Sequence, residues 1–482
     1  MNIGNADIER IVKAVVQSME RSADGMAVAV PARAASAAPL PPLPMGVFAT
    51  LDDAVAEADK AYRQMRSVAM RSRVVAAIRQ AGERHAQELA ELAVAETGMG
   101  RVADKFVKNV AQALHTPGVE CLVPTVLSGD HGLTLMENAA WGVVASVTPS
   151  TNPAATIINN AISMIAAGNT VVFAPHPAAK GVSQRAITLL NEAVLAAGGP
   201  RHVITTVAQP NIATAQALFS YPGIHLLTVT GGEAVVEEAR KHTDKRLIAA
   251  GAGNPPVVVD ASANIEKAAR DIVWGASFDN NIICVDEKEV IVVASVADRL
   301  KEEMKKHKAV ELSADQARRL LELALGKVGL DNQGTVKREW MGRDAARIAS
   351  AIGLTVPEDT RLLFVETAPD HPFAVTELMM PVLPVIRVAD VGEAIDLAVK
   401  LEGNCKHTAA MHSRNLDHLD HMANAINTSI FVKNGPCLAG LGFGGEGWTS
   451  MTITTPIGEG VTSARTFVRQ RRCVLVDNFR IV

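Results

Sequence analysis

The chain has 482 residues, enough for about three domains, and 48% of them are hydrophobic, so a large core can be buried. The formal net charge of -4 provides no basic field for nucleic acid. The five cysteines are an odd number without metal-type CxxC spacing, which favours a reducing compartment and predicts neither a disulfide framework nor a metal site. No apolar run reaches the roughly 18 residues of a membrane span.

Residues 1–20 predict an amphipathic helix. Ile8, Ile11 and Val15 fall on one apolar stripe, opposite charged residues of both signs. Residues 21–45 form an Ala/Pro-rich linker that we expect to be extended. A helix on such a linker cannot bury its apolar face locally, so docking on a partner is expected. The alternatives are a helix folded back on its own domain and a membrane-surface helix, and the mixed charges disfavour the second.

The next segments predict two long helices and then a doubly wound α/β domain. The helices are expected at about 50–65 and 71–97, with Gly98 ending the second. From Trp141 onward, buried strands alternate with helices, which is typical of a parallel sheet covered on both faces. The expected strands are 142–147, 170–174, 203–207 and 225–229, and the expected helices are 153–167, 181–197, 212–219 and 231–241. No GxGxxG follows a strand, so a normal Rossmann fingerprint is absent.

A second α/β region is expected from about 255 to 462, and it contains Cys284. This cysteine follows a helical pattern at 265–277 and precedes a buried strand at 289–293. A cysteine on a loop between rigid elements suits a nucleophile, although a lone cysteine is more often a small core residue. Asp286 and Glu287 would raise the pKa of the thiol if they lie close. The remaining expectations are a charged helical part at 296–328, a flexible glycine-rich loop at 440–447 and an edge strand at 472–477.

Five segments, in this order, resemble motifs of the aldehyde dehydrogenase superfamily over most of the chain from Thr50. They are Val147 to Pro153, Phe173 to Pro177, Thr230 to Gly232, Cys284, and Glu377 to Pro381. The resemblance implies an α/β aldehyde dehydrogenase fold, with a Rossmann-like cofactor domain, an α/β catalytic domain and a small β oligomerisation element. The implied ranges are 46–253 for the NAD(H)- and CoA-binding domain, with part of the oligomerisation element near 117–140, then 254–462 for catalysis and 463–482 for a C-terminal oligomerisation strand.

Two departures point to one branch of that superfamily. Hydrolytic members carry a glutamate that activates water, and the matching position here is Ala250. The lysine that usually follows the second strand is Ala174 here, which puts the usual adenosine-ribose contact in doubt. The chain is similar to the CoA-acylating branch, and most of all to the propionaldehyde and acetaldehyde dehydrogenases of bacterial microcompartments. Their N-terminal helix and linker direct them into the protein shell, which would place this chain in the microcompartment lumen.

The resemblance implies an oxidation in two steps through one covalent intermediate. Cys284 would attack the aldehyde, Asn152 or Thr151 would stabilise the oxyanion, and NAD would take the hydride. Coenzyme A would then take the acyl group from the thioester, and His407 would be the base, unless it is a structural histidine. Glu377 would hold the nicotinamide ribose, unless it is a solvated carboxylate. The other cofactor-binding positions implied are Thr148, Pro149, Ser150, Pro175, His176, Thr230, Gly231 and Gly232, of which His176 could equally be merely exposed.

Two other functions stay open at this point. A hydrolytic aldehyde dehydrogenase would release the free acid, and a shell-associated scaffold protein would have lost catalysis. The implied partners are a short-chain aldehyde, the microcompartment shell through residues 1–20, and further copies of this chain in a homodimer or homotetramer, with neither nucleic acid nor membrane. The sequence does not distinguish propanal from acetaldehyde.

Overall fold

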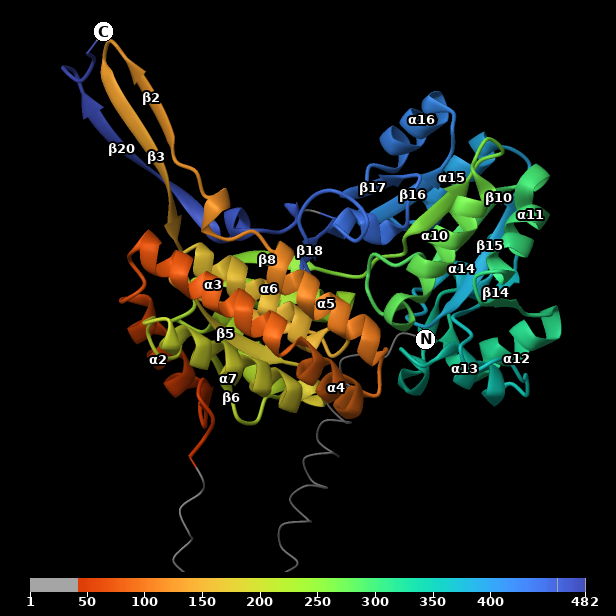
Figure 1. Ribbon diagram of the computed structural model, residues 1–482, viewed down its shortest axis with the longest axis horizontal. Helices are drawn as coiled ribbons and strands as arrows, with labels where there is room; N and C mark the ends of the chain where they lie inside the picture. The colour runs from red at the N-terminus through yellow and green to blue at the C-terminus, as the bar shows by residue number, and fades with distance from the viewer. Residues whose placement is uncertain (1–41, 457, 482) are drawn as a thin grey trace, which may run out of the picture. The chain divides into compact units, whose positions relative to one another are not determined.

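Two parallel sheets, each with helices on both faces, form the scaffold of the protein (Figure 1). The structure, a computed structural model, describes residues 42–456 and 458–481. The helix expected at 1–20 and nearly all of the linker expected at 21–45 lie outside the described residues. Among the residues described, no helix combines the length and the apolar character needed to cross a membrane.

The first sheet has six parallel strands in the order β1-β6-β5-β4-β7-β8. They are β1 (Val47–Phe48), β4 (Val143–Thr148), β5 (Thr170–Pro175), β6 (Ile204–Val207), β7 (Leu226–Thr230) and β8 (Arg246–Ala250). The chain runs outward from β4 through β5 to β6 and then returns to the other side of β4 with β7. The carboxyl ends of β4 and β7 therefore flank the switch point of the sheet, which is where ligands bind in open α/β sheets.

Alternation along the strands explains why helices cover both faces of this sheet. Val143 and Ala145 of β4 pack in one apolar cluster with α2, α8 and α9, whereas Val144 packs in another with α3, α6 and α7. The helices are α2 (Leu51–Tyr62), α3 (Val68–Arg84), α4 (Ala86–Thr97), α5 (Val102–His115), α6 (Pro153–Ala166), α7 (Lys180–Ala196), α8 (Ile212–Ser220) and α9 (Glu233–His242). Every residue of α6 is buried, so this helix forms the centre of the first core.

The single long helix expected at 71–97 is wrong in one respect, because the structure has two helices there. His85 ends α3 and begins α4 with φ of -99° and ψ of 10°, outside the helical range. Its ring lies 2.9 Å from the carboxylate of Glu88, which stabilises the first turn of α4. The stop at Gly98 is confirmed, since this residue has the left-handed φ of 67° that glycine adopts at low cost.

The second sheet has seven parallel strands in the order β11-β14-β15-β10-β9-β16-β17. They are β9 (Pro256–Val259), β10 (Glu289–Val293), β11 (Ala309–Glu311), β14 (Leu362–Glu366), β15 (Val382–Val388), β16 (Thr408–His412) and β17 (Ile430–Lys433). Its helices are α10 (Ile265–Ser277), α11 (Ala294–Lys305), α12 (Ala314–Ala324), α13 (Ala345–Ala351), α14 (Pro372–Val375), α15 (Val391–Leu401) and α16 (Leu416–Ile426). The expected helical part at 296–328 is wrong in detail, because it contains the strand β11 and ends in β12 (Leu325–Val328).

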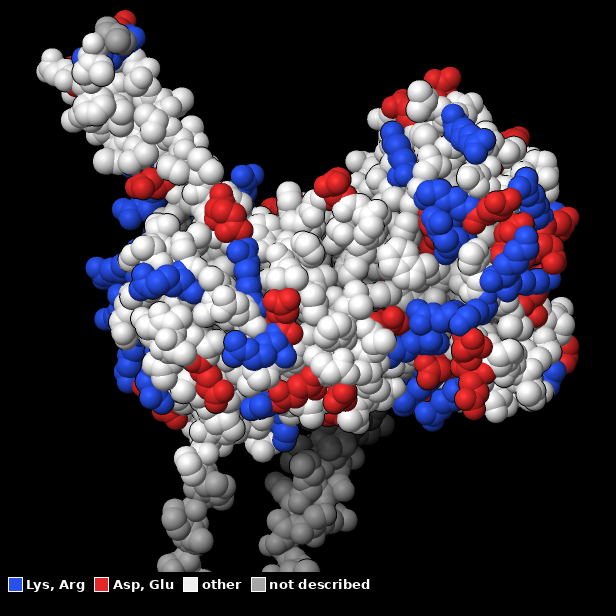
Figure 2. Space-filling model, in the orientation of Figure 1, with Lys and Arg blue, Asp and Glu red and all other residues white. Residues whose placement is uncertain are grey.

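A separate three-stranded antiparallel sheet combines two neighbouring strands with a third strand from the C-terminal part of the chain. It has the order β2-β3-β20, from β2 (Thr125–Gly129), β3 (Gly132–Ala140) and β20 (Val468–Val476). The expected C-terminal edge strand is confirmed, and it is longer than the tail pattern indicated. Few charged side chains lie on the face of this sheet that Figure 2 shows, and Leu127 and Val476 are 58% and 68% exposed. The remaining pairs are β12 with β13 (Gly334–Val336) and β18 (Ile453–Thr454) with β19 (Gly460–Val461).

Candidate active site

Cys284 lies at the end of a loop whose backbone is held in an uncommon conformation. After α10, the residues Asp279, Asn280 and Asn281 have φ of 45°, 59° and 64°. Aspartate and asparagine are the residues besides glycine that adopt this left-handed region most readily, because their short side chains form local hydrogen bonds. Such a run persists only where the surroundings determine it, and this clustering is typical of functional sites.

Each of the three side chains in this loop has its own anchor. The Asn280 amide donates at 2.9 Å to the carbonyl of Gly342 and at 2.9 Å to a carboxylate oxygen of Asp344. The Asn281 amide donates at 2.9 Å to the carbonyls of Ala276 and Glu287. The Asp279 carboxylate accepts hydrogen bonds from two buried lysines, which are described below. The loop is therefore fixed to three different parts of the fold, and the position of the sulfur is fixed with it.

The thiol of Cys284 is held in its neutral form. Burial is the main cause that raises its pKa to about 12, and the carboxylate of Glu377 is the second. Lys288 acts in the opposite direction, and Asp286 adds a smaller increase. The expected effect of Asp286 is therefore present but minor, whereas Glu287 is not among the causes.

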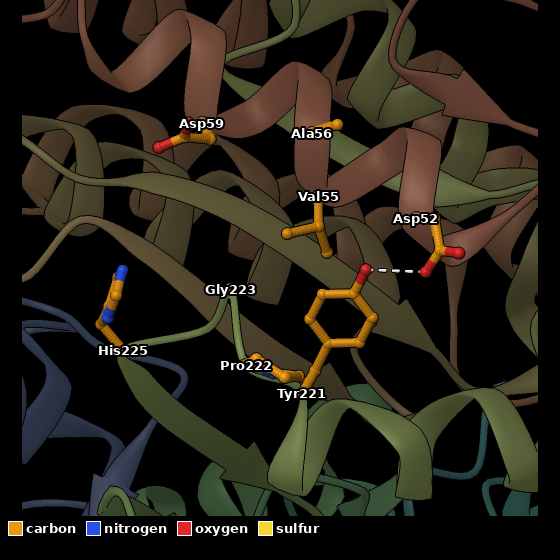
Figure 3. Close-up of a pocket in the computed structure, with 8 residues that line it drawn as sticks. All are labelled: Asp52, Val55, Ala56, Asp59, Tyr221, Pro222, Gly223 and His225. Carbon is orange, nitrogen blue, oxygen red and sulfur yellow. Dashed lines mark hydrogen bonds between the residues drawn. The ribbon is translucent and has the colours of Figure 1, made fainter.

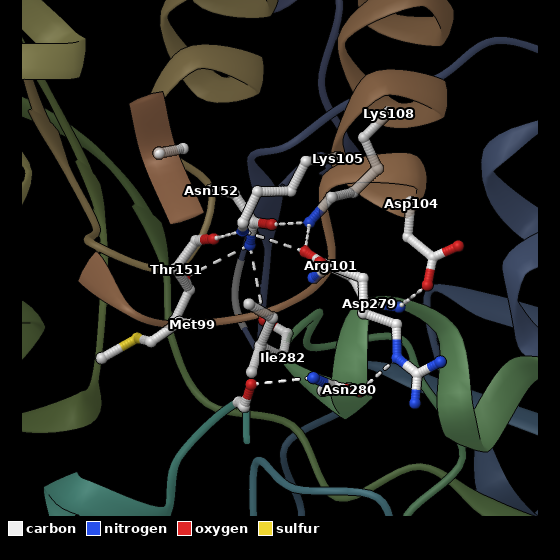
Figure 4. Close-up of polar contacts among 12 residues, drawn as sticks. Met99, Arg101, Asp104, Lys105, Lys108, Thr151, Asn152, Asp279, Asn280 and Ile282 are labelled. Carbon is white, nitrogen blue, oxygen red and sulfur yellow. Dashed lines mark hydrogen bonds and ion pairs between the residues drawn. The ribbon is translucent and has the colours of Figure 1, made fainter. Parts of the chain in front are cut away.

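The oxyanion candidate Asn152 lies beside the nucleophile loop (Figure 4). It is the residue before α6, and its side chain makes no capping hydrogen bond to that helix. Instead its amide nitrogen donates at 3.2 Å to the hydroxyl of Thr151 and at 3.4 Å to the carbonyl of Ile282, two residues before Cys284. Asn152 is 6% exposed, so the amide is available only to groups in this site.

His407 lies on the other side of the nucleophile. A Cβ added at Gly253 would be 2.9 Å from the carbonyl oxygen of Cys284 and 3.0 Å from the His407 ring, so the glycine backbone passes between the two. The His407 Nδ1 lies 2.8 Å from the hydroxyl of Thr408, while Nε2 is buried without a partner among the described residues. Burial lowers the pKa of His407 to about 4, which favours the neutral imidazole at neutral pH.

Glu377 belongs to the same site. It follows α14, and its carboxylate raises the pKa of both Cys284 and Cys405. Burial raises the pKa of Glu377 itself, while Lys288 and the backbone N–H of Gly253 lower it. The carboxylate of this half-buried residue therefore acts on the nucleophile and is itself affected by Gly253, which belongs to the segment that connects the two large sheets.

The predicted cofactor residues gather at the carboxyl edge of the first sheet. Thr148 and Pro175 pair at the ends of β4 and β5, and the His176 N–H donates to the Thr148 carbonyl at 3.1 Å. Thr230 ends β7, and its hydroxyl lies 2.9 Å from that of Thr452. Pro149 and Ser150 follow β4 and are half-buried, and Gly231 and Gly232 lead into α9.

Two of these residues also have local structural roles. His176 accepts the N–H of Ala178 at 3.1 Å through Nδ1, so its ring begins the helical turn that follows β5. The Gly231 N–H donates to the carbonyl of Ala250 at 3.1 Å. Gly232 has no such constraint, since an added Cβ would meet no described atom within 4 Å.

Sequence reasoning missed a buried charged run directly after the nucleophile. Asp286, Glu287, Lys288 and Glu289 are at most 3% exposed. Burial raises the pKa of all three carboxyls, that of Glu287 to about 8. The Lys288 ammonium donates to the carbonyls of Asn281 and Ile283 at 3.0 and 3.3 Å, so it holds the nucleophile loop in place. A run of four charges is usually a solvated surface, and only Glu289, at the start of the strand expected at 289–293, stood in a segment that the sequence marked as buried.

A surface hollow of about 470 Å³ lies away from these residues (Figure 3). It is lined by α2 and by the segment 221–225, which precedes β7 and so lies at the amino edge of the first sheet. The Tyr221 hydroxyl donates at 2.7 Å to Asp52, and this bond raises the pKa of Tyr221 to about 12. None of the predicted site residues lines this hollow.

Comparisons with known proteins identify the family of this chain. The sequence profile of the aldehyde dehydrogenase family matches residues 21–323. The chain is 69% identical over 476 residues to acetaldehyde dehydrogenase (acetylating) EutE of Escherichia coli (strain K12), covering 99% of each. It superposes with a TM-score of 0.88 and 42% identity on a propionaldehyde dehydrogenase from the Clostridium phytofermentans fucose utilisation bacterial microcompartment, covering 91% of this chain and 100% of that one. For Rhodopseudomonas palustris propionaldehyde dehydrogenase with bound propionyl-CoA, the TM-score is 0.86 and the identity 45%, covering 90% and 95%. The chain therefore belongs to the aldehyde dehydrogenase family.

Proposed function

We propose that this protein oxidises a short-chain aldehyde, acetaldehyde or propanal, to its acyl-CoA with NAD as the oxidant. One observation carries the proposal. The Asn152 amide donates to the carbonyl of Ile282, two residues before Cys284, and the Glu377 carboxylate acts on the Cys284 thiol, while the resemblance puts Ala250 where a hydrolytic enzyme has its glutamate. The relatives support the acyl transfer, since one is described as acetylating and another was solved with propionyl-CoA.

The reaction begins with attack of the Cys284 sulfur on the aldehyde carbon. The oxygen then gains negative charge, and the Asn152 amide and the Cys284 backbone N–H are the donors that we assign to it. The Thr151 hydroxyl accepts the Asn152 amide at 3.2 Å and so holds it, and we do not assign Thr151 as an oxyanion donor. Burial raises the pKa of the Cys284 thiol to about 12 and lowers that of His407 to about 4, so full proton transfer before attack is unfavourable. We assign to the His407 Nε2 the role of taking the proton as the C–S bond forms.

The residues at the carboxyl edge of the first sheet suit a dinucleotide. Gly232 leaves open space at the first turn of α9, where backbone N–H groups attract phosphate, and Thr148 and Thr230 flank the switch point. Glu377 is the carboxylate that would accept ribose hydroxyls near the nucleophile. A bound NAD would supply the acceptor for the hydride from the carbon attached to Cys284.

The fate of the resulting thioester distinguishes acyl transfer from hydrolysis. Ala250 ends β8 with a buried methyl group, so no side chain at this position can deprotonate water. The thioester therefore persists until the coenzyme A thiol attacks the same carbon and Cys284 leaves. His407 is the candidate base for this second thiol as well, and the two half-reactions predict ping-pong kinetics.

The test measures NADH formed from propanal and from acetaldehyde, with and without coenzyme A, and identifies the product by chromatography. We expect sustained turnover only with coenzyme A, and no turnover in a Cys284→Ala variant that folds like the parent. Equal rates without coenzyme A, with free acid as product, would favour the hydrolytic function. Undiminished oxidation by the Cys284→Ala variant would remove the assigned nucleophile, and a parent protein without any turnover would favour the scaffold.

We further propose the division of labour that the resemblance implies, with 46–253 binding the cofactor and 254–462 supplying the nucleophile. The sheet β2-β3-β20 would join copies of the chain, because its edge strand β20 exposes backbone groups and apolar side chains such as Leu475 and Val476. Sedimentation of the parent and of a Val476→Lys variant tests this, since we expect a dimer or tetramer that dissociates more readily in the variant.

Residues 1–20 would direct the protein to a microcompartment shell, and the lumen would be its location. The apolar stripe of this segment supports the proposal, together with the microcompartment origin of the Clostridium phytofermentans relative. The test is a fusion of residues 1–42 to a fluorescent reporter, expressed with shell proteins. Co-localisation is expected, and it should disappear when Ile11 and Val15 are replaced by Glu.

A further inference from the structure

The helix α5 has its polar and apolar faces reversed. Its buried residues are Lys105, Lys108, Asn109, Gln112 and Ala113, whereas Phe106, Val107 and Leu114 are 38%, 43% and 45% exposed. Two lysines on the inner face of a helix are costly, since each ammonium loses its hydration. A buried ion pair is weak support for stability, so the lysines need another explanation.

Both lysines are directed at the nucleophile loop and at the residues before α6 (Figure 4). The Lys105 ammonium lies 3.0 Å from a carboxylate oxygen of Asp279 and 2.8 Å from the carbonyl oxygen of Thr151. The Lys108 ammonium pairs with the same oxygen of Asp279 and also donates to the amide oxygen of Asn152. The other Asp279 oxygen accepts the backbone N–H of Arg101 at 2.7 Å.

The charges of this cluster do not cancel. Two ammonium groups share the single carboxylate of Asp279, so the three side chains carry a net positive charge when both lysines are protonated. Burial lowers the pKa of Lys105 to about 8, and the neighbouring Lys108 charge contributes to this shift. The excess positive charge lies against the amide oxygen of Asn152, which is 6% exposed and has little access to screening water.

We infer that Lys108 positions the oxyanion donor and strengthens it. Because the amide oxygen of Asn152 is occupied by Lys108, its NH₂ group must face Ile282 and the Cys284 side of the site. A cation on the oxygen of an amide also draws electrons from its nitrogen, so the N–H becomes a stronger donor to an oxygen that gains charge. Lys108 is thus a positioning residue that acts through Asn152 and does not touch the aldehyde.

Lys105 provides the matched comparison within the same cluster. It contacts the carbonyl of Thr151 and the carboxylate of Asp279 but not the Asn152 amide. Replacing either lysine leaves one ammonium to pair with Asp279, so neither single variant buries an unpaired carboxylate. The two variants therefore share the structural cost, and only one of them removes the contact to the amide.

The experiment is a double-mutant cycle, and it rests on the proposed acylating function. The variants are Lys108→Met, Asn152→Ala, their combination, and Lys105→Met, all in the full chain, with kcat and kcat/KM measured for propanal with NAD and coenzyme A. Loss of an oxyanion donor reduces kcat by about 10²–10³-fold, which we expect for Asn152→Ala. We expect Lys108→Met to reduce kcat at least about 10-fold with a much smaller change in KM, and Lys105→Met to reduce it less.

The decisive quantity is the effect of Lys108→Met in the Asn152→Ala background. If Lys108 acts through the amide, the combined variant equals Asn152→Ala within about twofold. If the two losses multiply, or if Lys108→Met has the parent kcat, the inference is overturned. Should the methionine variant not fold, Lys108→Gln takes its place under the same rule, because a neutral glutamine fills the site without the charge.

The rate of Cys284 alkylation by iodoacetamide is the second readout. This substitution forms no oxyanion, so the rate should stay within about twofold of the parent in Lys108→Met if the loop keeps its structure. A large change would instead assign Lys108 to the loop and overturn the inference. Failure of the acylating function itself is recognised separately, by parent turnover that is equal without coenzyme A and gives free acid, whatever the lysine variants do.

Discussion

The protonation state of Cys284 gives the most quantitative prediction. With a thiol pKa of about 12, roughly one molecule in 10⁴ carries the thiolate at pH 8. Alkylation of Cys284 by iodoacetamide in the protein without cofactor should therefore rise about tenfold for each pH unit from 8 to 11. Cys473 on the exposed strand β20 serves as an internal reference thiol in the same sample.

The carboxylate of Glu377 is the part of this shift that can be removed by substitution. Glu377→Gln removes the negative charge that raises the pKa of Cys284 most, so this pKa should fall and alkylation of Cys284 at pH 8 should accelerate. Lowering the pKa by one unit corresponds to about 1.4 kcal/mol and a tenfold rate, which is the scale we expect. Asp286→Asn is the control, since burial already favours the neutral form of that carboxyl and its effect on the thiol is smaller.

The assay is peptide mass spectrometry of protein quenched at timed intervals, with Cys284 and Cys473 quantified separately. A Cys284 rate that levels off below pH 9 would refute the assigned suppression of the thiolate. A Glu377→Gln rate equal to or below that of the parent would refute the role of the carboxylate. The first result would mean that the free protein already holds an activated nucleophile, and the second that burial alone keeps the thiol neutral.

Three further substitutions test other parts of the site. Gly275→Ala places a Cβ in a clash with a carboxylate oxygen of Glu287, so it should destabilise the fold by about 1–3 kcal/mol. Gly129→Ala is the control, because its added Cβ meets no described atom within 4 Å, and thermal unfolding of both variants decides. The pKa of Glu287 is raised to about 8 in the folded protein, so the unfolded chain loses this proton first and the stability of the fold falls as pH rises from about 4.5 to 8. Glu287→Gln should remove up to ~5 kcal/mol of that loss, measured by denaturation at pH 5, 6.5 and 8. An unchanged pH dependence in the variant would contradict the assignment. Ala250→Glu should release free acid from propanal without coenzyme A, detected by chromatography, while Ala250→Gln, the neutral control, should not.

Much of the architecture was predictable from local patterns. The helix at 265–277 and the strand at 289–293 have the expected bounds, because their apolar residues repeat with a clear period and polar segments flank them. The break at His85 and the strand β11 were missed. In both places, packing against distant elements decides between conformations that the local sequence allows almost equally.

The site was only partly predictable, for a related reason. Cys284 and Asn152 stand in recognisable motifs, but the groups that position them do not. Lys108 comes from a helix more than 40 residues before Asn152, and a lysine on a helix is normally read as solvent-facing. The pKa of His407 depends on how deeply the fold buries it, which no pattern of residue types specifies.

The left-handed run before Cys284 has a consequence for the thermal inactivation of the protein. Its three residues are tied to α5, to the segment 342–344 and to Glu287 in the segment just before β10, so local opening at any one of these displaces the sulfur. Local openings cost less free energy than global unfolding. The half-life of activity at elevated temperature should therefore depend on the weakest of these three attachments. Variants selected only for a higher melting temperature should not have a longer half-life of activity.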